Sequence, residues 1–183
     1  MAVAQPITAD EYLSLEDPRR TELVAGEVIV HAPAPLHQIV VLDVLREIDA
    51  WIRAAPRRGQ VWIPLDVKLD ERNVFAPDLL WYRDGRTLPR GAQSPSPLPD
   101  LAVEVRSPST WRYDIGAKKS AYERHGLHEL WLVDTAADVV LVFRRSSAKA
   151  EAFDVSLELA ADDELTSPLL PGFGLSLRTL FAA

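Results

Sequence analysis

The chain has 183 residues, of which 48% are hydrophobic, and this length suits one well-filled core better than two. Its formal net charge of −7 argues against a surface covered with phosphate-binding cations, and a cysteine count of 0 excludes disulfides, thiolate metal sites and a cysteine nucleophile. The sequence therefore predicts a single domain over residues 1–183 in a reducing compartment, the cytoplasm. No window approaches the roughly 18 apolar residues of a membrane span, so no membrane association is expected.

The first elements in chain order are a short helix, a hairpin and a long helix. Thr8 and Glu11 have the spacing of a capping box, which predicts a short helix after Thr8. Apolar residues on both sides of an Ala-Gly turn predict an N-terminal β-hairpin within residues 21–33. Apolar residues then recur at helical spacing over residues 37–54, which predicts the first major helix.

Strands dominate the next part of the chain. The expected strands cover residues 60–70, 75–83, 101–106, 127–135 and 139–145. Glycine, proline and serine are frequent in residues 84–99, which predicts a loop, and residues 112–125 predict a second helix. Short turns force the first strands into antiparallel pairs, whereas the second helix allows a parallel crossover. The order predicts an α/β fold with a mixed sheet flanked by helices.

Two acidic residues, Asp78 and Glu104, lie within these otherwise apolar strands. An ionised carboxylate is rarely buried alone, so Glu104 must face water, be paired or hold a cation. If the two strands pair in register, both carboxylates meet at one end of the sheet, where oxygen ligands suit Mg²⁺. Alternation along the strand places Glu104 and Arg106 on the face that the following helix is expected to cover.

That helix carries a stripe of polar residues that includes Asp114, Lys118 and Tyr122. Because these positions share one face, Lys118 can lean over the strand that bears Glu104. Two carboxylates and a lysine suit metal-assisted hydrolysis of a phosphodiester. The ion polarises the phosphoryl oxygen and acidifies a water, while the lysine stabilises charge or orients that water.

Simpler explanations for the same residues remain open. Asp78 follows a proline and can be only a strand-end cap. Glu104 can pair with Arg106 or Lys118, and Asp114 with Lys118 can form an ordinary helix pair worth about 0.3 kcal/mol. Spacing alone favours these explanations over a metal site.

A series of motifs extends over nearly the whole chain: TELVAGEVI, APDLLW, PDLAVEVRSPST, YDIGAKKSAYERHGLHELWLVD and LTSPLLPGF. In this order and spacing they resemble the Uma-type family of restriction-endonuclease-like proteins, within the PD-(D/E)XK nuclease superfamily. The resemblance implies a restriction-endonuclease-like αβββαβ core with an added N-terminal hairpin. It also implies a site for Mg²⁺ or Mn²⁺ and a nucleic-acid substrate, with DNA as the first hypothesis.

The resemblance assigns roles to individual residues. Asp78 matches the aspartate of the family's PD motif, and Glu104 matches the acidic residue of its third strand. The place of the E-x-K lysine holds Arg106, a permanent cation that binds phosphate but is a poor proton shuttle, so the lysine role is expected at Lys118. The pocket is expected to include further polar residues: Glu27, His37, Arg106, Asp114 and Tyr122.

Two hypotheses from different classes follow. The first is a DNA endonuclease with Asp78, Glu104 and Lys118 as catalytic residues, in which Asp78 and Glu104 hold Mg²⁺ or Mn²⁺. The second is a catalytically silent nucleic-acid-binding or assembly module on the same core, which the acidic charge and Arg106 favour. A homodimer is expected, because apolar hairpins at both ends of the chain can pair across a two-fold axis.

Overall fold

The structure is a computed structural model that describes residues 6–16 and 20–182. Its helices are α1 (Ala9–Leu13), α2 (Pro35–Arg53), α3 (Trp111–Tyr113), η1 (Asp114–Lys118), α4 (Lys119–Arg124) and α5 (Leu177–Phe181). Its strands are β1 (Thr21–Val24), β2 (Glu27–Val30), β3 (Gln60–Trp62), β4 (Val67–Asp70), β5 (Asn73–Phe75), β6 (Leu79–Tyr82), β7 (Leu101–Val105), β8 (Glu129–Asp134), β9 (Val139–Arg144), β10 (Val155–Ala160), β11 (Glu164–Leu165) and β12 (Leu175–Ser176).

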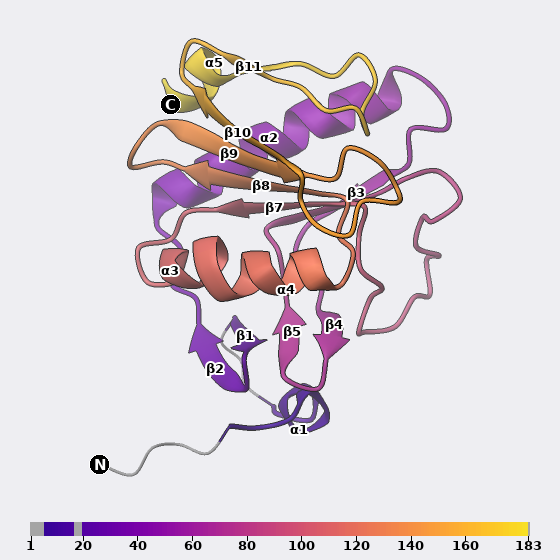
Figure 1. The fold of residues 1–183 in the computed structure, drawn as a ribbon, viewed down its shortest axis with the longest axis vertical. Helices are drawn as coiled ribbons and strands as arrows, with labels where there is room; N and C mark the ends of the chain where they lie inside the picture. Colours follow the sequence, from indigo (N-terminus) through magenta and orange to yellow (C-terminus); the bar gives the residue numbers. More distant parts are fainter. Residues whose placement is uncertain (1–5, 17–19, 183) are drawn as a thin grey trace.

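The strands form two main sheets. The central sheet has six strands in the order β10-β9-β8-β7-β6-β3, and the smaller sheet has four in the order β2-β1-β5-β4. Strands β7 and β8 are parallel and are joined through the consecutive helices α3, η1 and α4. Helix α2 covers one face of the central sheet, and α3–η1–α4 lies against the other face, next to the smaller sheet (Figure 1). The predicted α/β fold, a mixed sheet flanked by helices, is therefore confirmed.

The two faces of β7 belong to different layers of the core. Helix α2 buries residues at helical spacing: Val40, Val44, Ile48 and Trp51. These residues share a cluster with Val103 and Val105 of β7. On the opposite face, Ala102 shares a cluster with Tyr122 of α4. The alternation that the sequence predicted along β7 thus directs Glu104 toward α3–η1–α4.

The strands predicted over residues 60–70 and 75–83 are each divided between the two sheets. β4 and β5 pair in the smaller sheet, whereas β3 and β6 pair in the central sheet. Pro64 and Pro77 lie in the two interruptions. Proline has no N–H for a sheet ladder, so continuous strands through these positions are disfavoured. The interruption places Asp78 immediately before β6, where the chain passes from one sheet to the other.

The helix predicted over residues 112–125 contains a π-helical turn, η1. Single π-helical turns of this kind occur frequently at functional sites. Asp114, Lys118 and Tyr122 all lie on the buried side of the α3–η1–α4 segment, as the predicted stripe requires. After α4 the chain turns at Gly126, whose φ of +87° suits glycine at a helix end.

The N-terminal elements follow the sequence pattern. Thr8 and Glu11 form the predicted capping box at the start of α1. β1 and β2 form the predicted hairpin, with positive φ angles of 53° at Ala25 and 86° at Gly26. Within residues 6–16 and 20–182, no helix is long and apolar enough to cross a bilayer.

Candidate active site

Asp78 and Glu104 lie next to each other at one end of β6 and β7. Leu79 pairs with Val103 in the antiparallel ladder, so the next pair outward is Asp78 and Glu104. The backbone N–H of Val105 donates to Asp78 Oδ2 at 2.8 Å. The register therefore places the two acidic residues side by side at the end of the sheet, as the strand pattern predicted.

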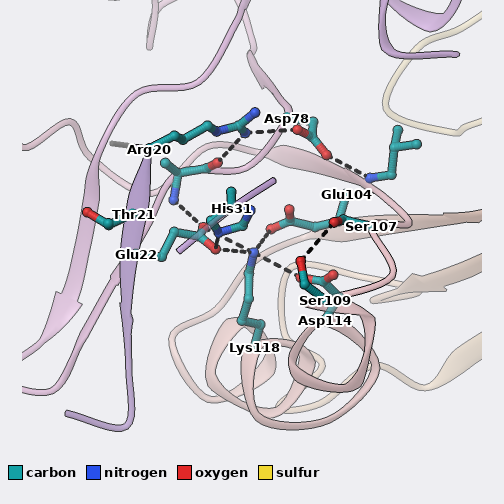
Figure 2. Close-up of polar contacts among 12 residues, drawn as sticks. Arg20, Thr21, Glu22, His31, Asp78, Glu104, Ser107, Ser109, Asp114 and Lys118 are labelled. Atoms are coloured by element: carbon teal, nitrogen blue, oxygen red, sulfur yellow. Dashed lines mark hydrogen bonds and ion pairs between the residues drawn. The ribbon is translucent and has the colours of Figure 1, made fainter. Parts of the chain in front are cut away.

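Lys118 extends from the π-helical turn into a group of carboxylates (Figure 2). Its Nζ lies 2.8 Å from Glu104 Oε1, 3.0 Å from Asp114 Oδ1 and 2.9 Å from Glu22 Oε2. The Lys118 side chain is 1% exposed. The helix stripe thus brings the ammonium group to Glu104, as predicted, and surrounds it with carboxylate oxygens.

Glu22 is a member of this cluster that the sequence reasoning missed. It is buried on β1, and both of its carboxylate oxygens accept hydrogen bonds from Lys118. His31 Nε2 lies 2.6 Å from Glu22 Oε2, and the N–H of Ala76 donates to Oε1 at 2.6 Å. One signal was available: Glu22 precedes two consecutive apolar residues, a pattern of strands buried on both faces. An acid in such a strand requires a partner, because an ionised carboxylate is rarely buried alone.

Two side chains hold the carboxylate of Asp78. Arg20 Nη2 donates to Oδ1 at 2.8 Å, and His37 Nε2 lies 3.1 Å from Oδ2. His37 is in the first turn of α2, so the start of this helix lies beside Asp78. The predicted place of His37 in the pocket agrees with this contact.

Tyr122 fixes the other carboxylate of the pair. Its hydroxyl donates to Glu104 Oε1 at 2.8 Å. Its ring packs edge-on against Phe75 of β5, with ring centroids 5.2 Å apart. Phe75 also faces Lys118, whose Nζ lies 5.6 Å from the ring centroid. The aromatic pair therefore encloses one side of the charged cluster and keeps it from water.

Two residues predicted for the pocket lie outside the cluster. Glu27 is exposed at the start of β2, paired with Val24 beside the hairpin turn, whereas the buried acid of this hairpin is Glu22. Arg106 follows the last residue of β7, and its Nη1 donates to the two oxygens of Asp134 at 2.8 and 2.9 Å. Strand alternation no longer directs a side chain beyond the strand end, so Arg106 turns toward the end of β8.

Two of the acids remain ionised because their partners outweigh burial. Burial alone would raise the pKa of Glu22, but the charge of Lys118 and the hydrogen bond with His31 lower it to about 2. Burial also acts to raise the pKa of Asp78. The hydrogen bond with His37 and the nearby guanidinium group outweigh this effect, so the pKa lies below its usual value.

The pKa values of the other two acids, Glu104 and Asp114, are raised. Burial raises the pKa of Glu104 well above its usual value, and the neighbouring carboxylates, first Asp114, add to this rise against the opposing charge of Lys118. Burial likewise raises the pKa of Asp114. Burial would lower the pKa of Lys118, but the carboxylates around it raise it well above the usual value. Lys118 is therefore a fixed cation.

The cluster combines four acidic residues with two cations. Among the described residues the cluster joins the carboxylates of Glu22, Asp78, Glu104 and Asp114 to the ammonium of Lys118 and the guanidinium of Arg20. The two acids with a lowered pKa, Glu22 and Asp78, balance these two cations, and the raised pKa values of Glu104 and Asp114 limit further negative charge. In the described ranges, no group of three or more His, Cys, Asp or Glu residues is arranged to hold a metal ion. Mg²⁺ commonly uses only one or two carboxylates with water and substrate oxygens, so Asp78 and Glu104 are the residues that would hold it.

Comparison with known proteins identifies the family. The family model of Uma2, described as "Putative restriction endonuclease", matches residues 9–178. The chain belongs to the Uma2 family. The resemblance drawn from the sequence motifs is therefore confirmed. Among the curated proteins, no sequence matches this Uma2 chain.

A solved structure shares the fold of this Uma2 protein. It is the crystal structure of a "putative nuclease belonging to DUF820" from Anabaena variabilis ATCC 29413. The two chains are 20% identical and superpose with a TM-score of 0.77, over 97% of this chain and 98% of the other. At this identity the similarity establishes a common fold.

Proposed function

We propose that this Uma2 family protein is a divalent-metal-dependent endonuclease that hydrolyses phosphodiester bonds in DNA. The observation that carries the proposal is the 2.8 Å contact between Lys118 Nζ and Glu104 Oε1, beside Asp78. This contact combines a fixed cation with an acidic pair at the edge of a sheet. The family description supports the class of reaction.

Different residues of the cluster would bind the metal ion and stabilise charge. Asp78 and Glu104 would hold Mg²⁺ or Mn²⁺, and the bound ion would polarise a phosphoryl oxygen and acidify a water molecule. Tyr122 orients the Glu104 carboxylate through its hydrogen bond. Lys118 has a raised pKa and stays protonated, so it serves as a fixed positive charge and not as a base. Glu22 fixes the position of that charge.

A substrate panel tests the proposal. Duplex, single-stranded and branched DNA and RNA are incubated with the protein in Mg²⁺, in Mn²⁺ or in a chelator. We expect cleavage of DNA with either metal and none with the chelator. Asp78→Ala and Glu104→Ala should be inactive, whereas Asp134→Ala, which removes a carboxylate outside the cluster, should remain active. Cleavage confined to RNA would reject DNA as the substrate, and metal-independent cleavage would reject the metal.

A second function is a nucleic-acid-binding or assembly module without catalysis. The observation that favours it is the burial of Lys118, which is 1% exposed and neutralised by its carboxylate partners. Calorimetry with Mn²⁺ separates the two functions. The nuclease proposal expects heat of binding from the wild type and none from Glu104→Ala. Absence of heat from both proteins would favour the module.

We also infer a homodimer. The edge strands β2 and β10 of the two sheets expose apolar residues: Val28 at 37%, Val30 at 39% and Leu157 at 37%. Exposed apolar edge strands are sites where a second chain can pair. Light scattering at micromolar concentration should give the mass of a dimer, and the mass of a monomer would contradict the inference. We also propose a cytoplasmic location, as the composition predicts.

A further inference from the structure

A cavity of about 300 Å³ lies between the chain that links β3 to β4 and the loop that follows β6. The loop is held there by the N–H of Ser96, which donates to the carbonyl of Asp66 at 2.7 Å. One side of the cavity is apolar and includes Trp62, Leu65 and Leu88. The carboxylate-bearing residue Asp66 provides a polar wall.

This cavity adjoins the candidate active site. Asp66 also lines a second cavity, of about 460 Å³, that Arg20 and Ala76 border. Arg20 and Ala76 each donate a hydrogen bond to an acid of the cluster. Burial raises the pKa of Asp66, against the hydrogen bond from Ser94, and the charge of Glu22 adds to this rise. The two cavities share Pro64 and Asp66 in their linings, so one adjoins the residues that hold the acidic cluster and the other adjoins Trp62.

The groups around the smaller cavity match the chemistry of a nucleic-acid base. Aromatic and apolar side chains stack on the faces of bases, and Trp62 with Leu88 offers such surfaces. An ionised carboxylate only accepts hydrogen bonds, so Asp66 selects a ligand that donates. The contact from Ser94 Oγ to Asp66 is long, at 3.4 Å, and leaves the carboxylate with acceptor capacity. Arg90 lines the same cavity. It is exposed, so its guanidinium group can bind a phosphate.

We propose that the cavity receives one unstacked base of the substrate strand, and that this base carries an exocyclic amino group. The ring lies against Trp62, and the amino group donates to Asp66. The adjacent phosphodiester then extends past Arg20 to Asp78 and Glu104. Cytosine, adenine and guanine have the required amino group, whereas thymine offers only its ring N3–H, which lies between two carbonyl oxygens that an ionised carboxylate repels. The proposal rests on the proposed nuclease function, because it places the base of a nucleic-acid substrate beside the acidic pair.

Nuclear magnetic resonance provides a direct test that does not depend on cleavage. The signal of the Trp62 indole N–H is assigned as the one missing from Trp62→Phe. It is then followed while the 183-residue chain is titrated with the deoxynucleoside monophosphates of cytosine and thymine and with deoxyribose 5-phosphate. We expect the cytosine nucleotide to shift this signal and to bind more tightly than the thymine nucleotide. Deoxyribose 5-phosphate should leave the signal unchanged.

Variants of Asp66 test the proposed hydrogen bond. Asp66→Ala should weaken binding of the cytosine nucleotide about tenfold, the effect of a loss near 1.4 kcal/mol. Asp66→Asn, which keeps the size of the side chain, should also weaken binding and replaces Asp66→Ala if that variant does not fold. The matched control is Asp84→Ala, which removes an aspartate that lines a different cavity and should bind as the wild type does.

Three results would overturn the proposal: no shift of the Trp62 signal, an equal shift with deoxyribose 5-phosphate, or unchanged affinity in both Asp66 variants. The test also separates this proposal from the nuclease function. A protein that binds the cytosine nucleotide at Trp62 but cleaves no substrate has the base site without the nuclease activity. A protein that cleaves DNA without any response at Trp62 has the activity without the base site.

Discussion

Lys118 and Glu22, which are 96 positions apart in the sequence, form an ion pair in the interior of the protein. The Lys118 ammonium donates to both carboxylate oxygens of Glu22, at 3.0 and 2.9 Å, and each side chain is 1% exposed. The pair joins the π-helical turn to the smaller sheet. It also positions the ammonium group beside Glu104.

Removal of the Glu22 charge should destabilise the fold. Glu22→Gln leaves a buried ammonium with one fewer carboxylate, and breaking a buried ion pair in this way costs about 3 to 5 kcal/mol. The control is Glu27→Gln on the same hairpin, which is exposed and should change the free energy of unfolding by less than about 0.5 kcal/mol. Urea denaturation of both variants measures the difference. Equal midpoints would contradict a stabilising role for the buried pair.

Acid should weaken the fold in a range set by Glu22. Its pKa in the folded protein is about 2, below the ordinary value of 4.5. Its contribution to the free energy of unfolding, about 3 kcal/mol, is therefore complete above pH 4.5 and is lost as the pH falls toward 2. Asp114 acts in the opposite direction, because its raised pKa favours protonation of the folded state as the pH falls.

Urea midpoints measured over a series of pH values test this dependence. The wild type should lose stability steeply below pH 4.5. Glu22→Gln has no carboxyl group to titrate at this position, so its decline in the same range should be shallower. Parallel curves for the two proteins would show that other carboxylates dominate acid unfolding.

Two adjacent lysines should differ in their effect on cleavage. Lys118→Ala should lower the rate about a hundredfold to a thousandfold, since it removes a charge-stabilising group that costs about 3 to 4 kcal/mol of barrier when lost. Lys119→Ala should stay within about twofold of the wild type. The Lys119 Nζ lies 4.5 Å from the ring centroid of Phe143, outside the acidic cluster. Single-turnover rates on the cleaved substrate provide the comparison.

The folding of the lysine variants must be measured with their rates. Lys118→Ala leaves buried carboxylates without their counter-charge, so it should also unfold at a lower temperature. Circular dichroism identifies a temperature at which both variants are folded, and the rates are compared there. A folded Lys118→Ala variant with the wild-type rate would remove Lys118 from the proposed reaction.

Arg106 should be dispensable for cleavage although it occupies the usual lysine position. Its guanidinium pairs with Asp134, so Arg106→Lys should retain the wild-type rate. Arg106→Ala should lower the free energy of unfolding by less than about 1 kcal/mol, because the Arg106 side chain is 32% exposed. A tenfold change of rate in Arg106→Lys would show that this position reaches the reacting phosphate.

The features that sequence patterns predicted correctly depend on burial that repeats at a fixed period. Val40 and Val44 lie on the buried stripe of α2, and Glu104 alternates with the core residues of β7. The contact between Lys118 and Glu104 could be predicted for the same reason, since a helix that follows a strand packs on that strand with one stripe. Local periodicity therefore predicted the contact at the centre of the candidate site.

Other features depend on contacts between distant parts of the chain. Pro64 and Pro77 predict interruptions, but a proline does not determine which sheet the next residues join. Glu22 finds its partner through the packing of the smaller sheet on α3–η1–α4, which leaves no local pattern beyond an acid in a buried strand. Arg106 lies past the end of β7, where strand alternation gives no direction for the side chain.

The division of two strands at Pro64 and Pro77 has a consequence for how the site can fail. Glu22 belongs to the smaller sheet, while Glu104 belongs to the central one, so the cluster is complete only when the two layers are docked. Leu23 pairs with Val74 inside the smaller sheet, and both are fully buried. A cavity made at Leu23 should loosen this layer and separate the acids while the central sheet stays folded. The acidic cluster is therefore intact only while the two layers are packed together. In such a variant, cleavage activity should be lost at a lower temperature than the helical and strand content.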